Sequence, residues 1–219
     1  MEIMAEFEDE SIDMAGPDLV LPWWRNPLTQ TILIAALLVG LLAFGYRWGH
    51  SNGGEEFNKV DVGYLQDMRV HHEQAVNMSI LYLEGAPDGT RLIREIAREI
   101  LVDQSIDNGR MIQMLRIFHK PEANPTDTGM SWMDMPSPLE QMPGMASDDE
   151  LVELSKATGS SADKLFVELM IDHHEGGIHM SEYVVKHGLN DEVVAMAQAS
   201  IKAQQSDLAE LKKFAKANS

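Results

Sequence analysis

The hydrophobic and polar positions divide the chain into two parts with different patterns. Residues 28–46 form a continuous apolar run without a charged residue, which is about the length that a helix needs to cross a bilayer. Aromatic residues, which favour the two interfaces of a membrane, flank this run at Trp23, Trp24, Tyr46 and Trp48. We therefore predict a single transmembrane anchor over residues 23–48, followed by a linker over residues 49–56.

Residues 1–22, ahead of the anchor, are predicted to form a disordered acidic tail, because residues 1–18 carry seven acidic side chains and no basic one. A long acidic segment without a small-residue cleavage site does not fit a cleaved signal peptide. Arg25 and Arg47 flank the anchor almost symmetrically and leave its orientation open. A short tail before a large domain favours the domain on the extracytoplasmic side.

After the linker, apolar residues recur every three or four positions, which is the period of amphipathic helices. This period predicts four long helices and a short one, at residues 57–84, 90–118, 161–187, 191–216 and, for the short helix, 148–157. Residues 119–147 are rich in Pro, Gly and Met and show no such period. A connection this long is either a functional lid or a disordered linker. No strand pattern competes with the helices.

An internal repeat indicates how these helices are arranged. The segment Met68–Ser79, MRVHHEQAVNMS, returns 102 residues later as MIDHHEGGIHMS at Met170–Ser181. A Gln-x-x-Asp motif also occurs twice, 100 residues apart, at Gln104 and Asp107 and at Gln204 and Asp207. Two copies of a helical hairpin predict an all-α four-helix bundle over residues 57–217.

The first and third helices place histidines inside this bundle. At 100° per residue, one face about 120° wide carries the apolar and histidine positions of each helix. On the first helix this face holds Met68, His71, His72, Ala75, Met78 and Ser79. On the third helix it holds Met170, His173, His174, Gly177, Met180 and Ser181. Both histidine pairs are therefore predicted to point inward.

The second and fourth helices add polar residues to the same core. Their predicted inward positions are Ile93, Ala97, Ile100, Gln104, Asp107, Met111, Met114 and Phe118, and Val194, Ala197, Ile201, Gln204, Leu208, Leu211 and Ala215. Asp207 lies at the edge of the second set. A buried polar group without a partner costs roughly 1–3 kcal/mol. The histidines are the obvious partners for the two glutamines and two aspartates.

Composition narrows the chemistry that this core can carry. The chain has 35 Asp and Glu against 17 Lys and Arg, a formal net charge of −18, so phosphate backbones would repel it and we expect no nucleic-acid partner. Cysteine is absent, which excludes disulfides, thiolate metal sites and thiol catalysis. A metal ion would have to be held by His, Met, carboxylate or amide groups.

Four inward histidines suit either a metal site or a closed network of His with Asp and Gln that only fixes helix register. Histidine with thioether sulfur and no thiolate suits copper better than zinc, iron or magnesium. A di-iron site of the four-helix type needs Glu-x-x-His, which the chain lacks. The loop methionines either collect Cu(I) or pack over the end of the bundle; they are Met130, Met133, Met135, Met142 and Met145.

These motifs resemble the domain-of-unknown-function family 305, small ferritin-like helical proteins of bacteria. The resemblance rests on Met-x-x-His-His-x-x-x-x-x-Met in both copies, on Met142-Pro-Gly-Met145, on residues 165–174 and on the two Gln-x-x-Asp motifs. It implies an extracytoplasmic helical domain and, in some members, copper binding or tolerance. By that resemblance the positions to carry over are His71, His72, Met78, His173, His174 and Met180. Gly177 departs from the pattern, which usually has Ala there.

We expect a protein of the bacterial cell membrane, anchored by residues 28–46, that binds copper in storage, delivery or detoxification. His71, His72, His173 and His174 would be the central ligands, with Met78 and Met180 as supplementary ones. Gln104, Asp107, Gln204 and Asp207 would support the ligands, and the methionine loop would be an uptake site.

The alternative is an accessory subunit of a larger membrane complex, such as a respiratory one, in which the histidines only hold the bundle together. Both hypotheses can be true at once, because a copper-handling protein can attach to a copper enzyme. An enzyme is the least expected class, since the sequence shows no nucleophile–base pair and no nucleotide-binding loop.

Overall fold

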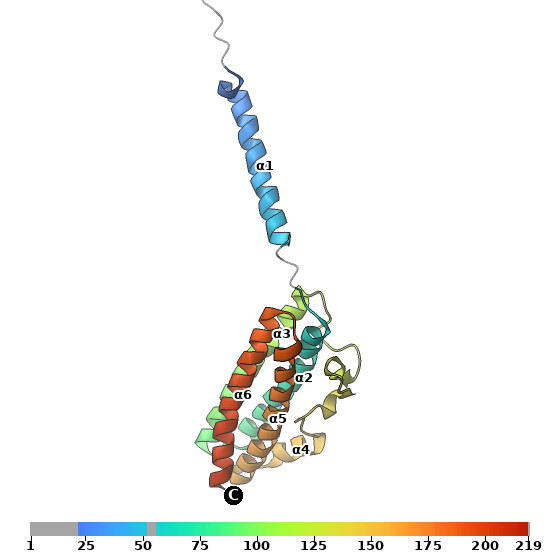
Figure 1. Cartoon of the computed structure of the whole chain (residues 1–219). Helices are drawn as coiled ribbons and strands as arrows, with labels where there is room; N and C mark the ends of the chain where they lie inside the picture. Colours follow the sequence, from blue (N-terminus) through green and yellow to red (C-terminus); the bar gives the residue numbers. More distant parts are fainter. Residues whose placement is uncertain (1–21, 52–55, 219) are drawn as a thin grey trace, which may run out of the picture. The chain divides into compact units, whose positions relative to one another are not determined.

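The structure, a computed structural model, describes residues 22–51 and 56–218 (Figure 1). It separates into two compact units that divide after Gly54. The predicted acidic tail, apart from Pro22, lies outside the described residues.

The first unit is an apolar helix. A short 3-10 turn, η1 (Trp23–Arg25), precedes α1 (Pro27–Ser51). The stretch Pro27–Tyr46 has a mean hydropathy of 2.1 and is not buried against other parts of the chain, so its length and composition are those of a membrane span. Helix α1 ends at Ser51, inside the range predicted for the linker, residues 49–56.

The second unit is the predicted four-helix bundle, shown in Figure 1. Its long helices are α2 (Lys59–Gly85), α3 (Arg91–Ile117), α5 (Gly159–His187) and α6 (Asp191–Ala217). A shorter helix, α4 (Asp148–Lys156), packs against α2 and α5. Helix α2 packs along α3 and α5, and α5 packs along α6. All-α architecture from two hairpins is therefore confirmed, with helix ends within a few residues of the prediction.

Side-chain caps explain where several of these helices begin. The Asn58 side chain accepts hydrogen bonds from the backbone N–H groups of Val60 and Asp61, at 2.7 and 3.0 Å. The Asp61 carboxylate accepts in return from the backbone N–H of Asn58, at 2.8 Å, completing a capping box. Ser147 and Glu150 form the same arrangement at the start of α4.

Two aspartates at equivalent places join the hairpins. Asp61, at the start of α2, accepts hydrogen bonds from the backbone N–H groups of Leu189 and Asn190 in the turn between α5 and α6. Asp163, at the start of α5, accepts from the backbone N–H and the hydroxyl of Thr90, just before α3. Each hairpin therefore caps the turn of the other hairpin.

The hydrophobic core consists of two clusters with the histidines between them. One cluster contains Met68 of α2 and Met180 of α5. The other contains Met78 of α2 and Met170 of α5. Since both histidine pairs lie between these methionines in the sequence, they form a polar layer across the middle of the bundle.

The inward face of α6 differs from the prediction in its first half. Val193, Met196 and Ser200 are buried, whereas Val194 and Ile201 are only partly buried. The helix is rotated by about one position, and Ser200 enters the core because its hydroxyl accepts a hydrogen bond from the Gln204 side chain at 2.7 Å. In α3, Asp107 is likewise only partly buried.

The connection over residues 119–147 is folded, so the disordered-linker alternative is wrong. It contains the antiparallel two-residue strands β1 (Thr128–Gly129) and β2 (Ser137–Pro138) and the 3-10 turns η2 (Ser131–Met133) and η3 (Leu139–Gln141). The strands escape prediction because a two-residue ladder has no period to detect.

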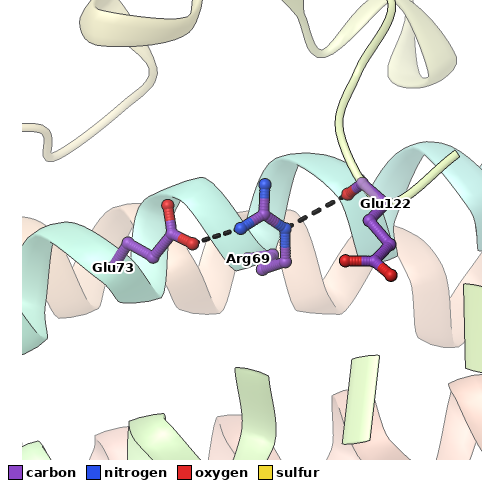
Figure 2. A network of polar contacts seen from close by, with 3 residues as sticks. All are labelled: Arg69, Glu73 and Glu122. Atoms are coloured by element: carbon purple, nitrogen blue, oxygen red, sulfur yellow. Dashed lines mark hydrogen bonds and ion pairs between the residues drawn. The ribbon is translucent and has the colours of Figure 1, made fainter. Parts of the chain in front are cut away.

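Two side chains of α2 hold this connection against the bundle. The buried Asp67 carboxylate accepts hydrogen bonds from the Met130 backbone N–H (2.6 Å) and the Trp132 indole N–H (2.8 Å). Figure 2 shows Arg69 donating to the backbone oxygen of Glu122, at 3.1 Å, while it pairs with Glu73 one turn along the helix. The connection therefore has fixed attachment points on one helix.

Candidate metal centre

Four histidines meet at the centre of the bundle. His71 and His72 come from α2, His173 and His174 come from α5, and none is more than 2% exposed. The rings of His71 and His173 lie face to face, with centroids 3.8 Å apart and planes tilted by 31°. The rings of His173 and His174 have centroids 6.3 Å apart. The prediction that both pairs point inward agrees with these positions.

Three of the rings donate a hydrogen bond from Nε2. His71 donates to the backbone oxygen of Pro143 at 3.1 Å, and His173 donates to the backbone oxygen of His71 at 2.9 Å. The Nε2 of His174 lies 2.9 Å from a carboxylate oxygen of Asp207. Carbonyl and carboxylate oxygens only accept, so the proton of each ring is on Nε2.

This arrangement leaves the other ring nitrogen with a lone pair. A neutral imidazole carries one N–H, and a proton on Nε2 makes Nδ1 an acceptor. Among the described residues, the Nδ1 atoms of His71, His72, His173 and His174 are buried and have no hydrogen-bond partner. Metal-binding histidines characteristically give their second N–H to a carbonyl or a carboxylate. The rings of His71, His173 and His174 thus present nitrogen donors already held in the tautomer that a metal ion requires.

Burial favours the neutral form of three of the rings, those of His71, His72 and His173. Loss of solvent lowers the pKa of His71 to about 4, partly opposed by the Pro143 carbonyl. The pKa values of His72 and His173 are held well below the usual range by the same burial, and by repulsion from the neighbouring histidines when these are protonated. A ring that stays unprotonated at neutral pH keeps its lone pair available to a metal ion.

The four supporting residues predicted from the sequence behave differently from one another. Asp207 contacts His174. Gln204 instead donates to Ser200, and Asp107 accepts from Arg110 at 3.2 Å. Gln104 is buried, and its side-chain oxygen has no partner within the described part of the chain. The structure thus brings one of the four, Asp207, into hydrogen-bond contact with a histidine.

The predicted sulfur ligands flank the histidine layer. Met78 and Met180 are fully buried, one in each core cluster. Met68 and Met170, which the sequence places on the same inward face, are equally buried. Thioethers therefore lie on both sides of the histidines along both α2 and α5.

The loop methionines separate into two groups. Met130, Met133 and Met142 are buried in the cluster that contains Met68, so these three pack over the bundle as the gap-filling alternative predicts. Met135 is 48% exposed. Met145 lines a surface cavity next to α5.

The donor set fits copper, although the side chains do not yet converge. Over residues 22–51 and 56–218, no group of three or more His, Asp or Glu side chains is placed to hold a metal ion as it stands. The unpaired Nδ1 atoms and the adjacent thioethers are nevertheless soft and borderline donors of the kind that Cu(I) prefers. The side chains must move before they can surround an ion. Because the four rings already share one layer, these movements need not involve the helices.

Sequence reasoning missed several residues that build the centre. The Tyr64 hydroxyl lies 3.1 Å from that of Ser181, which donates to the backbone oxygen of Gly177; burial raises the Tyr64 pKa to about 12. Tyr64 was not among the predicted inward positions, and a helical period gives no sign of its partner. Pro143 was also missed as a histidine partner, because a backbone carbonyl leaves no signature in a sequence.

Comparison with known proteins identifies the family. The profile of the family described as Domain of unknown function (DUF305) matches residues 61–215, which include both hairpins. The chain belongs to the DUF305 family. A DUF305 protein of Streptomyces coelicolor described as secreted is 31% identical, with a TM-score of 0.65 over 71% of this chain and 91% of that one. A comparison with curated proteins finds no match.

Two further solved structures share the DUF305 fold. A DUF305 fragment from Deinococcus radiodurans is 26% identical, with a TM-score of 0.62 over 73% of this chain and 97% of that one. CopM in its Cu(I)-bound form is 21% identical, with a TM-score of 0.55 over 70% of this chain and 94% of that one. CopM has also been solved with Cu(II) and with silver. At that identity the likeness to CopM shows the fold alone.

Proposed function

We propose that this protein is a membrane-anchored, extracytoplasmic copper-binding protein. The observation that carries the proposal is the layer of four buried histidines, each with an unpartnered Nδ1, between two methionine-bearing clusters. A layer that only fixed helix register would be expected to satisfy its buried polar atoms, because each unpaired one costs roughly 1–3 kcal/mol. The metal-bound CopM structures support the choice of copper.

In this proposal His71, His72, His173 and His174 hold the ion through Nδ1, with Met78 and Met180 as supplementary ligands. A site built from these ligands would have an affinity for soft metal ions, which suits storage or delivery of copper. Pro143 and Asp207 keep two of the rings in the binding tautomer through their oxygen atoms. Uncharged ligands in a buried site favour Cu(I), since a single positive charge is the easier one to bury.

The anchor and location complete the proposal. Helix α1 has the length and hydropathy of a membrane span, and the Streptomyces relative is described as secreted. These observations support a bundle held at the outer face of a bacterial cell membrane.

Metal content of the full chain in detergent tests the proposal. After addition of copper and extensive dialysis, the wild type should keep about one or more copper ions per chain. The H173Q/H174Q variant should lose them, because an amide nitrogen is a far weaker ligand than imidazole. Gln keeps a polar group beside Asp207 and fills more of the space than Ala, so the helical circular dichroism should persist.

The matched control is H119N/H187Q, which removes two histidines outside the layer. Asn suits position 119 because His119 has a positive φ of 52°, where Asn is tolerated. This variant should keep its copper. Equal retention by both double variants, or none by the wild type, would overturn the proposal.

The accessory-subunit alternative has one specific observation in its favour. Helix α3 exposes three large apolar side chains on one face: Val102, Ile106 and Ile117 are 51%, 57% and 47% exposed. An exposed apolar face of this kind is typical of a surface that contacts another protein. Co-purification with a large integral-membrane protein in mild detergent would support this alternative, and a free monomer loaded with copper would count against it.

A further inference from the structure

A short backbone segment crosses the histidine layer between η3 and α4. We call residues 142–146 the strap. The Pro143 carbonyl in the strap accepts the His71 ring N–H. One turn along α2, the Gln74 amide forms two hydrogen bonds to the backbone of Ala146, at 2.7 and 2.8 Å. The strap is thus fastened to the same helix that carries His71 and His72.

The strap also lies directly on the backbone of α5. A Cβ atom at Gly176 would overlap the Pro143 carbonyl oxygen, and one at Gly144 would overlap the backbone oxygen of Asp172. Gly144 has a φ of 83°, which favours glycine. Two glycines therefore permit a backbone contact that closes the layer on this side.

The outer face of the strap borders an acidic cavity. This cavity has a volume of about 470 Å³ and is lined by the strap and by Glu150, Asp172, Glu175 and His179. Pro143 lines the cavity and also contacts His71. The backbone of the strap is therefore the wall between solvent and the first histidine of the layer.

We infer that the strap is the gate through which copper reaches and leaves the histidine layer, and that its Pro143 carbonyl positions His71. This inference rests on the proposed function, because it specifies how that site is filled. Glu175 is paired with Lys212 at 2.7 Å, so Glu150 and Asp172 are the carboxylates that attract cations to the mouth of the gate. Displacing the strap would remove the hydrogen-bond partner of His71 and, in the same movement, expose His71 to solvent.

A competing route would pass Asp207 on the other side of the layer. Asp207 is 25% exposed at its side chain and contacts His174. Passage by that route would be indifferent to the strap, so a variant that moves the strap alone separates the two routes.

Adjacent glycines on α5 provide such a variant and its matched control. The G176A methyl group collides with the Pro143 carbonyl, which is backbone and must move away. The G177A methyl group collides instead with the side-chain amide of Gln204 and leaves the strap in place. Both variants add one methyl group to the same turn of the same helix.

The experiment measures transfer of Cu(I) from the loaded full chain, in detergent, to excess bicinchoninate. We expect G176A to release copper about tenfold faster or more than the wild type, the scale on which loss of a ligand's hydrogen-bond partner acts. G177A should release it at the wild-type rate. Equal rates for the wild type and G176A would overturn the inference.

A second readout needs no metal. Diethyl pyrocarbonate modifies unprotonated imidazole, and peptide mass spectrometry reports its attachment at His71. G176A should speed modification of His71 while G177A should not; unchanged modification would overturn the inference. If the wild type retains no copper, the proposed function fails, and this readout still decides whether the strap covers His71.

A further variant guards against misfolding of G176A. Q74A removes both hydrogen bonds to Ala146 without adding an atom to α5. It should speed modification of His71 in the same direction. Slow, wild-type modification in Q74A with intact helicity would contradict the gate.

Discussion

At the scale of single residues, the decisive feature is the position of one proton on each histidine. Oxygen acceptors from Pro143, His71 and Asp207 hold the proton on Nε2 of three rings, so Nδ1 of each ring keeps a lone pair in the buried core. The residue types were predictable from the repeat. Of the three acceptors only Asp207 was predicted, because the other two are backbone carbonyls that any residue could supply.

Burial of these neutral rings predicts a dependence of stability on pH. The folded pKa of His71 is lowered to about 4, and those of His72 and His173 are lowered as well. Below about pH 6.5 these histidines therefore bind protons in the unfolded chain but remain unprotonated in the folded chain. The free energy of unfolding should have its full value above about pH 6.5. As the pH drops further, it should fall by up to about 1.4 kcal/mol per pH unit for each of these rings.

Urea unfolding of the metal-free chain between about pH 7 and pH 5 measures this slope, in a window above the ordinary titration of carboxylates. The H71Q variant is the control and should show a shallower slope, since one of the shielded rings is gone. A slope that is flat in the wild type, or unchanged in H71Q, would contradict the neutral, buried histidine layer.

At the scale of elements, the connection between the hairpins depends on one buried carboxylate. Asp67 accepts from the Met130 N–H, the Trp132 indole and the Asn124 amide. Trp132 packs on Gly63, where any Cβ would overlap the indole ring. Sequence periodicity placed Asp67 next to the inward Met68 but gave no partner for it, since its donors lie 57 to 65 residues away.

Replacing Asp67 by Ala should detach this connection. Each buried donor that loses its acceptor costs roughly 1–3 kcal/mol, so the free energy of unfolding should fall by a few kcal/mol. The Trp132 environment should become more exposed, which fluorescence of a variant with Trp23, Trp24 and Trp48 replaced by Phe would report. Wild-type stability and fluorescence in the Asp67→Ala chain would show that the carboxylate does not anchor the loop.

The two aspartates that join the hairpins make a prediction about additivity. Asp61 and Asp163 perform the same task at opposite ends of the bundle, so D61N and D163N should each destabilise the fold by roughly 1–3 kcal/mol. Because sites that share no partner act independently, the double variant should lose the sum. Unfolding in urea measures all three; a double variant no less stable than either single one would contradict independent locks.

At the scale of the whole molecule, most of the fold could be predicted from the internal repeat. Its offset of 102 residues paired the histidines correctly and predicted two hairpins, because the 3.6-residue period of a helix is written in local sequence. The same offset relates Asp61 to Asp163, a correspondence that could have been found in the sequence and was overlooked. The strap could not have been predicted, since the backbone contact at Gly176 depends on the position of a distant loop.

The separation into an apolar helix and a bundle predicts how truncation behaves. The full chain should require detergent, because α1 exposes its apolar side chains from Pro27 to Tyr46. A chain that starts at Glu55, where the second unit begins, should stay soluble after ultracentrifugation of cells lysed without detergent. A full chain that is equally soluble would contradict the anchor.

X-ray absorption at the copper edge of the Cu(I)-loaded full chain is the most direct test of copper binding at the histidine layer. We expect scattering from imidazole nitrogen together with sulfur, because the layer of His71, His72, His173 and His174 lies between the clusters that contain Met78 and Met180. The imidazole contribution should be lost in H173Q/H174Q and kept in H119N/H187Q. A copper shell of oxygen alone, or an imidazole signal as strong in H173Q/H174Q as in the wild type, would contradict a copper site at the histidine layer.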